Sequence, residues 1–163
     1  MIEIAQAEKR DLPGITAIYD DAILHSTATF DVTPRTRTQQ LDWFRRHGEK
    51  HPVIVAREDG EVVGWASLNV FHERCAYEKT VEDSVYVKHD RRGRGIGTAL
   101  LRRLIELARG LAHHSIVARI ADHSVPSIAL HETLGFKEVG ELREAGRKFD
   151  RWIDVTLMQL LLE

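Results

Sequence analysis

The sequence predicts a single domain over residues 1–163 of the α/β or α+β class, with a mixed sheet and helices on both faces. Its length is that of one ordinary domain. Hydrophobic residues make up 43% of the chain and charged residues 29%, which is typical of a globular protein with one real core. Patterns typical of strands and helices follow in the order β-α-α-β-β-β-α-β-α-β-β, which favours a sheet covered by helices.

The first part of the chain predicts one strand and two helices. Residues 2–6 alternate weakly in hydrophobicity, as a short strand does. Asp11 is a typical N-cap, and apolar residues follow it at helical spacing up to Ile23. After a polar loop over 25–34, we expect Thr38 to cap a second helix.

The middle of the chain predicts a hairpin and a further strand. Residues 53–57 and 61–70 are rich in Val, Trp and Leu, and the Asp-Gly pair between them is a strong hairpin signal. Residues 71–80 break this pattern. A short β-branched strand is expected at 83–87.

The last part predicts two helices and three strands. Residues 98–112 place leucines on one face and charges on the other, which is typical of an amphipathic helix. A strand is expected at 115–120, and a helix between Ser124 and a C′ glycine, Gly135. Two final strands, joined by a loop rich in Gly, Lys and Arg, are expected at 136–142 and 152–162.

Composition excludes several classes of protein. A net charge of −2 does not suit a general nucleic-acid binder, and the single Cys75 excludes an internal disulfide framework. No apolar run has the ~18 residues of a membrane span. The N-terminal residues do not resemble a signal peptide, so we expect a cytoplasmic protein that does not bind membranes. His113, His114 and His123 lack Cys or acidic partners in a ligand pattern, so no metal is expected.

A glycine-rich turn before the amphipathic helix predicts a site for an anionic ligand. Glycines let a backbone approach phosphate oxygens, and a helix N-terminus offers free N–H groups. Between residues 88 and 103 the only acid is Asp90. The basic residues there are Lys88, Arg91, Arg92, Arg94, Arg102 and Arg103.

Several phosphate-binding motifs can be distinguished at this turn. The Gly-Lys-Ser/Thr of a P-loop is absent, and Leu100 stands where a dinucleotide-binding motif has its third glycine. An ordinary tight turn with solvated arginines is the plain alternative. The pattern Arg92-x-x-Gly95-x-Gly97 resembles the pyrophosphate loop of the Gcn5-related N-acetyltransferase (GNAT) superfamily, which binds acetyl-CoA.

Further segments carry the resemblance over nearly the whole chain. Residues 127–136 resemble the family helix that precedes the last hairpin. The chain is also similar to the branch that acetylates phosphinothricin, methionine sulfoximine and methionine sulfone. The segments behind that likeness are 26–30, Arg74 with Tyr77, 82–87, 130–132 and 146–154. The resemblance implies a mostly antiparallel central sheet and a homodimer.

The resemblance also implies a binding site for acetyl-CoA, the co-substrate. Strand 85–87 is expected to splay from its neighbour and offer backbone groups to the pantetheine arm. Ser124 stands where many relatives have Asn. The residues expected to bind acetyl-CoA are Val85, Tyr86, Val87, Arg92, Gly93, Arg94, Gly95, Ile96, Gly97, Thr98, Ser124 and Thr133.

The implied chemistry is direct acetyl transfer to an amine, which must first lose its proton. The resemblance makes Glu82 the general base, directly or through a water. His131, where the wider family has Tyr, is expected to protonate the coenzyme A sulfur or to orient the substrate. An arginine suits the carboxylate of an amino acid. The residues expected at the substrate are Phe30, Arg74, Tyr77, Lys148 and Phe149.

Other functions remain open on the sequence. Acetylation of a protein N-terminus or lysine would favour an open acidic groove. A regulatory module would bind acetyl-CoA without turnover. A structural protein would leave the glycine–arginine turn without a purpose.

Overall fold

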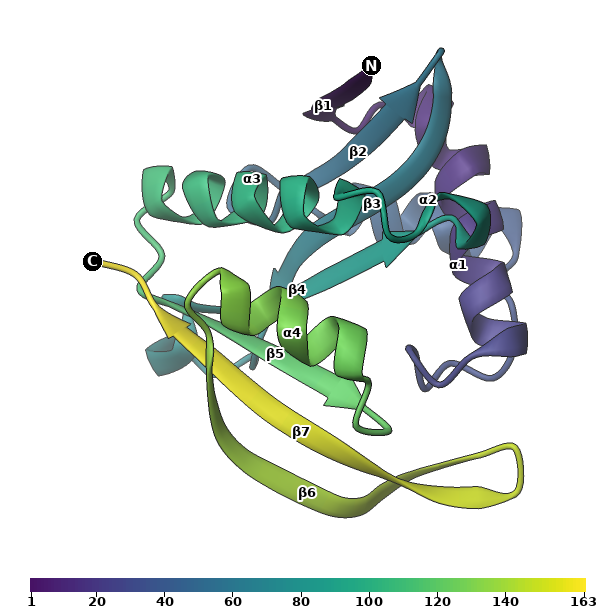
Figure 1. Ribbon diagram of the computed structural model, residues 1–163. Coiled ribbons are helices and arrows are strands. Elements are labelled where there is room, and N and C mark those ends of the chain that lie inside the picture. Colours follow the sequence, from purple (N-terminus) through teal and green to yellow (C-terminus); the bar gives the residue numbers. More distant parts are fainter.

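Seven strands form one sheet in the computed structural model, which describes residues 1–163 (Figure 1). The strand order is β1-β2-β3-β4-β5-β7-β6, and only β4 and β5 are parallel neighbours. The predicted mixed, mostly antiparallel sheet is therefore confirmed. The strands are β1 (Ile2–Gln6), β2 (Val53–Glu58), β3 (Glu61–Val70), β4 (Thr80–Val87), β5 (Ser115–Ala121), β6 (Lys137–Lys148) and β7 (Arg151–Leu161).

Helices cover both faces of this sheet, as predicted, with one hydrophobic core under each layer (Figure 1). On one face α3 and α4 pack over residues such as Leu68 and Met158. On the other face α1 and α2 pack over Trp65 and its neighbours. No helix is long and apolar enough to cross a membrane. The helices are α1 (Leu12–His25), α2 (Arg37–Arg46), α3 (Ile96–Gly110) and α4 (Val125–Thr133).

Helix α2 begins two residues earlier than expected. Thr36, rather than Thr38, is its N-cap: the Thr36 hydroxyl accepts from the Gln39 backbone N–H at 3.1 Å. The Gln39 side chain accepts from the Thr36 N–H at 2.8 Å, which completes a capping box. Thr36 stands two residues before Thr38, and Gln39, three positions after Thr36, is the signal in the sequence that indicates the earlier cap.

Two strand predictions were also too short. Strand β4 begins at Thr80 rather than at 83, which brings Glu82 into the sheet. The last hairpin is much longer than expected, because the predicted Gly/Lys/Arg-rich loop is the outer part of β6 and β7. Its turn consists of Phe149 and Asp150, both with positive φ. Most of β6 is exposed, so it lacks the hydrophobic alternation that marks a half-buried strand.

Candidate active site

A cleft opens where β4 and β5 diverge. The two strands pair only between residues 80–82 and 115–117. Beyond that point, residues 83–87 of β4 pair with β3 alone, so their backbone edge toward β5 is unpaired. The cleft has a volume of about 570 Å³ and is lined by β4, β5, α4, the loop after α1 and the β6–β7 hairpin. Unpaired backbone donors and acceptors at such an edge are available to a ligand.

Glu82 lies at the point of divergence, opposite Val117 in the last paired position of β4. Its side chain lines the cleft and is 24% exposed. Burial raises the pKa of Glu82; nearby Arg119, whose Nε lies 3.4 Å from Glu82 Oε2, opposes this, and Asp83 adds to it. A carboxylate with a raised pKa, open to a cleft, can accept a proton from a substrate.

The neighbouring Asp83 and His131 form a buried pair between β4 and α4. His131 Nε2 lies 2.7 Å from Asp83 Oδ2, and Nδ1 lies 2.7 Å from the Ser127 carbonyl oxygen. Burial lowers the pKa of His131, but the Asp83 hydrogen bond and charge outweigh it, so the pKa is raised overall. Both ring nitrogens therefore have acceptors. The pair ties α4 to β4 on the opposite side of the strand from Glu82.

Replacing Asp83 by asparagine is expected to lower the free energy of unfolding by about 3 kcal/mol, because it leaves a buried imidazolium without its counter-charge. Since folding raises the pKa of His131, the loss should be largest below the unfolded value of about 6.5 and shrink as the pH rises through the folded pKa. Urea unfolding at pH 6 and pH 9 measures both effects. Asp122→Asn, which breaks an exposed pair with Arg151, should change stability by less than about 1 kcal/mol.

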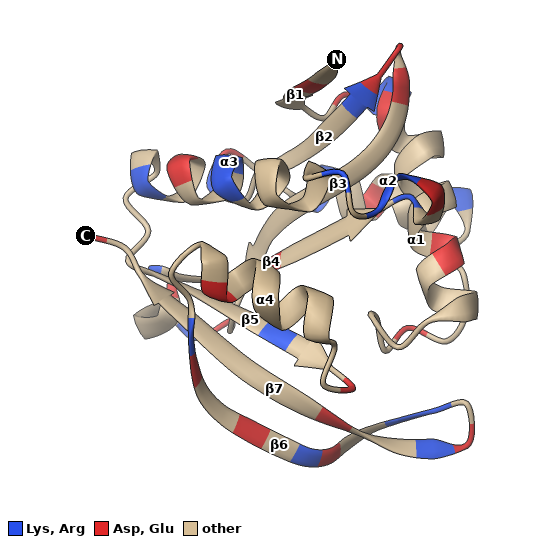
Figure 2. Cartoon of the chain, viewed as in Figure 1, with Lys and Arg blue, Asp and Glu red and all other residues tan.

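The glycine-rich turn follows β4 and forms the N-terminus of α3. Gly95 is the N-cap, with φ of +81°, and Gly93 has φ of +74°. A Cβ at either position would meet no protein atom within 4 Å, so the space over the turn is open. The turn is rich in positive charge (Figure 2). Its helical N–H groups and open backbone fit a phosphate group.

The two predicted arginines of this turn differ in their partners. Arg94 donates to Glu58 Oε1 at 2.6 Å, so its charge is already compensated. Arg92 makes only a long contact to the Val87 carbonyl at 3.3 Å and is exposed. Ile96 is buried in the core and supports the turn from below. Arg92 is therefore the freer of the two for an anion.

The predicted strand residues line or support the opened edge of β4. Val85 and Val87 pack against the core under α3, and Val85 also lines the cleft. The Tyr86 ring stacks on Trp65 with centroids 4.9 Å apart, and its hydroxyl donates to the Ala28 carbonyl. Burial raises the pKa of Tyr86, so its hydroxyl stays protonated. Side chains fix this strand while its backbone faces the cleft.

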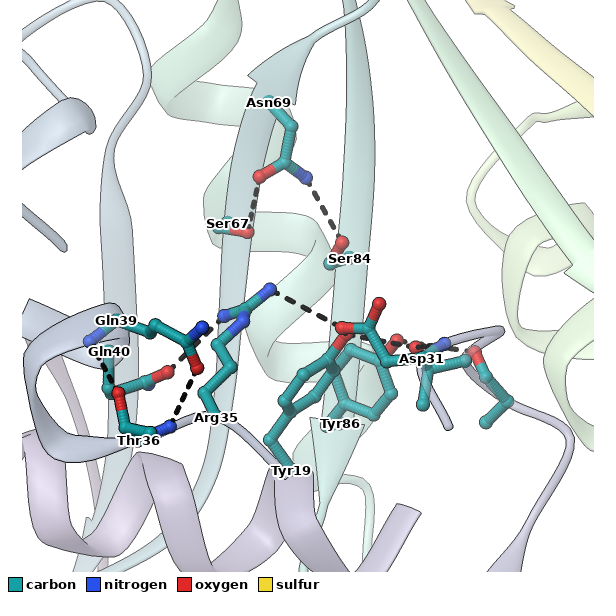
Figure 3. A network of polar contacts seen from close by, with 12 residues as sticks. Tyr19, Asp31, Arg35, Thr36, Gln39, Gln40, Ser67, Asn69, Ser84 and Tyr86 are labelled. Carbon is teal, nitrogen blue, oxygen red and sulfur yellow. Dashed lines mark hydrogen bonds and ion pairs between the residues drawn. The ribbon is translucent and has the colours of Figure 1, made fainter. Parts of the chain in front are cut away.

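A polar network holds the loop after α1 against the cleft wall (Figure 3). The Tyr19 hydroxyl donates to Asp31 at 2.5 Å and contacts the Thr29 hydroxyl at 2.9 Å. Burial and the Asp31 carboxylate raise the pKa of Tyr19 to about 12. The Arg35 guanidinium lies over the Tyr19 ring, 4.7 Å from its centroid. Figure 3 also shows the Asn69 amide donating to the Ser84 hydroxyl, at 3.0 Å. The same amide nitrogen donates to the Glu82 carbonyl at 3.1 Å.

Of the residues expected at the substrate, Phe30 alone lines the cleft. Lys148 is buried instead and donates to the Thr29 carbonyl at 2.8 Å, which anchors the loop that carries Phe30. Arg74, Tyr77 and Phe149 are exposed and lie outside the cleft of the single chain.

Three further residues expected at acetyl-CoA differ in where they lie. Ser124 lines the cleft at the start of α4, and Thr133 lies outside it at the far end of that helix. The Thr133 hydroxyl donates to the Ala129 carbonyl at 2.8 Å. The Thr98 side chain is half-buried in the first turn of α3.

His123 has acidic partners that the sequence pattern did not reveal. Its Nε2 lies 3.2 Å from Glu141 Oε1 and 3.3 Å from Asp154 Oδ2. The expectation that this histidine lacks acidic neighbours was therefore wrong, because the three residues come from separate elements. His123 and Glu141 are exposed, and Asp154 also accepts from the Glu144 backbone N–H.

Known proteins resemble this chain over most of its length. Residues 15–136 match the acetyltransferase (GNAT) family. The L-methionine sulfoximine/L-methionine sulfone acetyltransferase of Pseudomonas paraeruginosa is 43% identical over 162 residues, covering 98% of this chain and 94% of that protein.

Two solved structures have the same fold. An N-acetyltransferase from Staphylococcus aureus is 38% identical, with a TM-score of 0.97 and coverage of 100% and 99% of the two chains. A GNAT phosphinothricin acetyltransferase from Sinorhizobium meliloti in complex with acetyl-CoA is 36% identical, with a TM-score of 0.96 and coverage of 99% and 88%. Because the family match covers residues 15–136 and the relatives are 36–43% identical over nearly the whole chain, the chain belongs to the acetyltransferase (GNAT) family.

Proposed function

We propose that the protein transfers the acetyl group of acetyl-CoA to the α-amine of a small amino acid or analogue, with residues 1–163 acting as one domain. Methionine sulfone, methionine sulfoximine and phosphinothricin are the proposed substrates. The observation that carries this is Glu82, a carboxylate with a raised pKa at the mouth of the β4–β5 opening, in a chain similar to enzymes of that specificity.

The proposed acetyl-CoA site runs from the glycine turn into the cleft. The N–H groups at Gly93–Gly97 and the side chain of Arg92 hold the pyrophosphate, while the unpaired edge of 85–87 holds the pantetheine arm. Ser124 borders the same cleft from α4. The bound co-substrate supplies the activated acetyl group.

In the proposed mechanism Glu82 accepts a proton from the substrate ammonium, directly or through a water. The free amine nitrogen then bonds to the thioester carbonyl carbon, a backbone N–H of the β4 edge donates to the developing oxyanion, and the carbon–sulfur bond breaks. Coenzyme A leaves as a thiolate, and the nitrogen passes its remaining extra proton through water to that thiolate, which gives the neutral amide and the free thiol; the proton held by Glu82 is released to solvent. With a thiol pKa of ~8.5, this leaving group needs little assistance.

His131 has a positioning role in this proposal. Both of its ring nitrogens face acceptors, Asp83 and the Ser127 carbonyl, so neither is free to give a proton to sulfur without breaking the pair. The geometry favours orientation of α4 and the cleft wall over direct general-acid catalysis. The substrate amine and coenzyme A meet beside this wall.

A homodimer is the proposed assembly. On the α1 side no helix lies over β5, β7 and β6 (Figure 1). Exposed apolar side chains are found on β6 and β7 and in the turn between them. They are Val139, Leu142, Phe149, Trp152 and Leu161. Arg74, Tyr77 and Phe149 lie outside the cleft of their own chain. In a dimer they would reach a substrate bound in the cleft of the second chain.

Light scattering is expected to give about twice the chain mass of 18.6 kDa at micromolar concentration. The physical reason is that an exposed apolar sheet surface of this kind gains free energy when a partner covers it. Trp152→Glu, at the 56% exposed tryptophan, should shift the mass toward that of one chain. A wild-type mass of 18.6 kDa would contradict the dimer.

Mass spectrometry of the product tests the function itself. Incubation with acetyl-CoA and L-methionine sulfone should give the N-acetyl amino acid. Acetylation of a lysine peptide alone would favour the protein-directed alternative, and binding of acetyl-CoA without any product would favour a regulatory module.

A further inference from the structure

Arg119 is the only lysine or arginine that lines the cleft. It is also the only charged residue of β5 (Figure 2). It lies two residues beyond Val117, the last residue of β5 that pairs with β4, and so points to the same face as Glu82. Its side chain is 49% exposed.

Neighbouring groups position the Arg119 guanidinium but leave its hydrogen-bond donors free for a ligand. Its Nε lies 3.4 Å from Glu82 Oε2, longer than an ordinary N–H···O hydrogen bond, and the guanidinium makes no hydrogen bond within the chain. Its Cζ lies 5.7 Å from the centroid of the Phe71 ring, a cation–π contact. By contrast, Arg57 is fully engaged, with two hydrogen bonds to Asp11 at 3.0 and 2.7 Å.

A carboxylate and a guanidinium side by side match the two charges of an α-amino acid, whose ammonium and carboxylate are joined through one carbon. The planar fork of arginine binds a carboxylate through two parallel hydrogen bonds. Such a fork is free at Arg119, next to the carboxylate that would take the amine.

We propose that Arg119 binds the α-carboxylate of the amino acid substrate while Glu82 faces its α-amine. This rests on the proposed function and names a specificity-determining residue for it. Arg74, the arginine expected for this role from the sequence, is exposed and outside the cleft of its own chain. Arg119 needs no partner chain to reach the substrate.

The test compares L-methionine sulfone with its carboxamide, which keeps the amine and the side chain but lacks the negative charge. With acetyl-CoA saturating, Arg119→Gln is expected to raise KM for the sulfone about 10- to 100-fold, the usual effect of losing hydrogen bonds to a charged group. KM for the carboxamide should not change. Arg119→Lys, which keeps a charge without the fork, should fall between.

Arg109→Gln is the matched control: it removes an exposed arginine of α3 that lies outside the cleft, and it should leave the ratio of the two KM values as in the wild type. Acetyl-CoA affinity, measured by calorimetry, should be the same in every variant and confirms folding. Equal losses on sulfone and carboxamide in Arg119→Gln would overturn the assignment and indicate that Arg119 acts only through Glu82. A wild-type protein that acetylates neither compound would instead contradict the proposed function, and the assignment with it.

Discussion

Replacing Glu82 by glutamine is expected to lower kcat by about 10²–10⁴-fold, the usual contribution of a positioned general base. Glutamine keeps the shape and the hydrogen-bonding oxygen but cannot take the proton of the substrate ammonium. Acetyl-CoA affinity should not change, because Glu82 lies on the cleft wall and not at the glycine turn. Steady-state thiol release and calorimetric titration with acetyl-CoA measure the two quantities separately.

The pH dependence gives a second readout for this variant. Burial raises the pKa of Glu82 above its ordinary value of 4.5, so wild-type kcat should rise with pH along a limb that lies above that value, as the carboxylate loses its proton. The glutamine variant should lack that limb. Glu106→Gln is a matched control on the exposed face of α3, where Glu106 pairs only with Arg103, and should behave as the wild type. Full activity of Glu82→Gln between about pH 7 and 8 would dismiss Glu82 as the base.

Replacing Gly95 by valine is expected to weaken acetyl-CoA binding about 100-fold or more, since hydrogen bonds to charged groups contribute about 1.5–3 kcal/mol each and several are lost together. The valine side chain would occupy the open space over the turn. The positive φ of +81° is also strained for a β-branched residue, which would move the N–H groups of the α3 N-terminus.

Gly60→Val separates these two effects. Gly60 lies in the β2–β3 turn with φ of +83°, and a Cβ there also meets no atom within 4 Å. Its backbone strain therefore matches that of Gly95, so both variants should lose similar stability in thermal unfolding. Acetyl-CoA affinity should fall in Gly95→Val alone. Equal affinities in the two variants would contradict the assignment of the glycine turn.

The features that depend on local pattern could be predicted well from the sequence. The leucine face of α3 and the glycines before it lie within one short stretch, where helical periodicity indicates the helix and the glycines indicate a turn with positive φ. Ser124 and Gly135 likewise bound α4 as expected. In each case neighbouring residues carried the whole signal.

Contacts across the fold could not be predicted in the same way. Asp83 and His131 are 48 residues apart. In the sequence, Asp83 cannot be distinguished from a residue at the start of an ordinary strand, and only the packing of α4 against β4 brings His131 to it. Arg119 interrupts the apolar strand β5, and that interruption was the one signal in the sequence for a polar residue in the cleft. Lys148 was expected at the substrate, but β6 extends as far as this residue, and its side chain donates to the Thr29 carbonyl in the loop after α1.

The most direct test of the central claim is free-thiol release from acetyl-CoA with a panel of amines. The panel holds phosphinothricin, methionine sulfoximine, methionine sulfone, ordinary amino acids, a polyamine and a lysine peptide. We predict release with the sulfone, the sulfoximine or phosphinothricin, at a kcat/KM above that for the peptide and the polyamine. Release with the peptide or polyamine alone, or no release from a protein that still binds acetyl-CoA, would contradict an amino acid N-acetyltransferase.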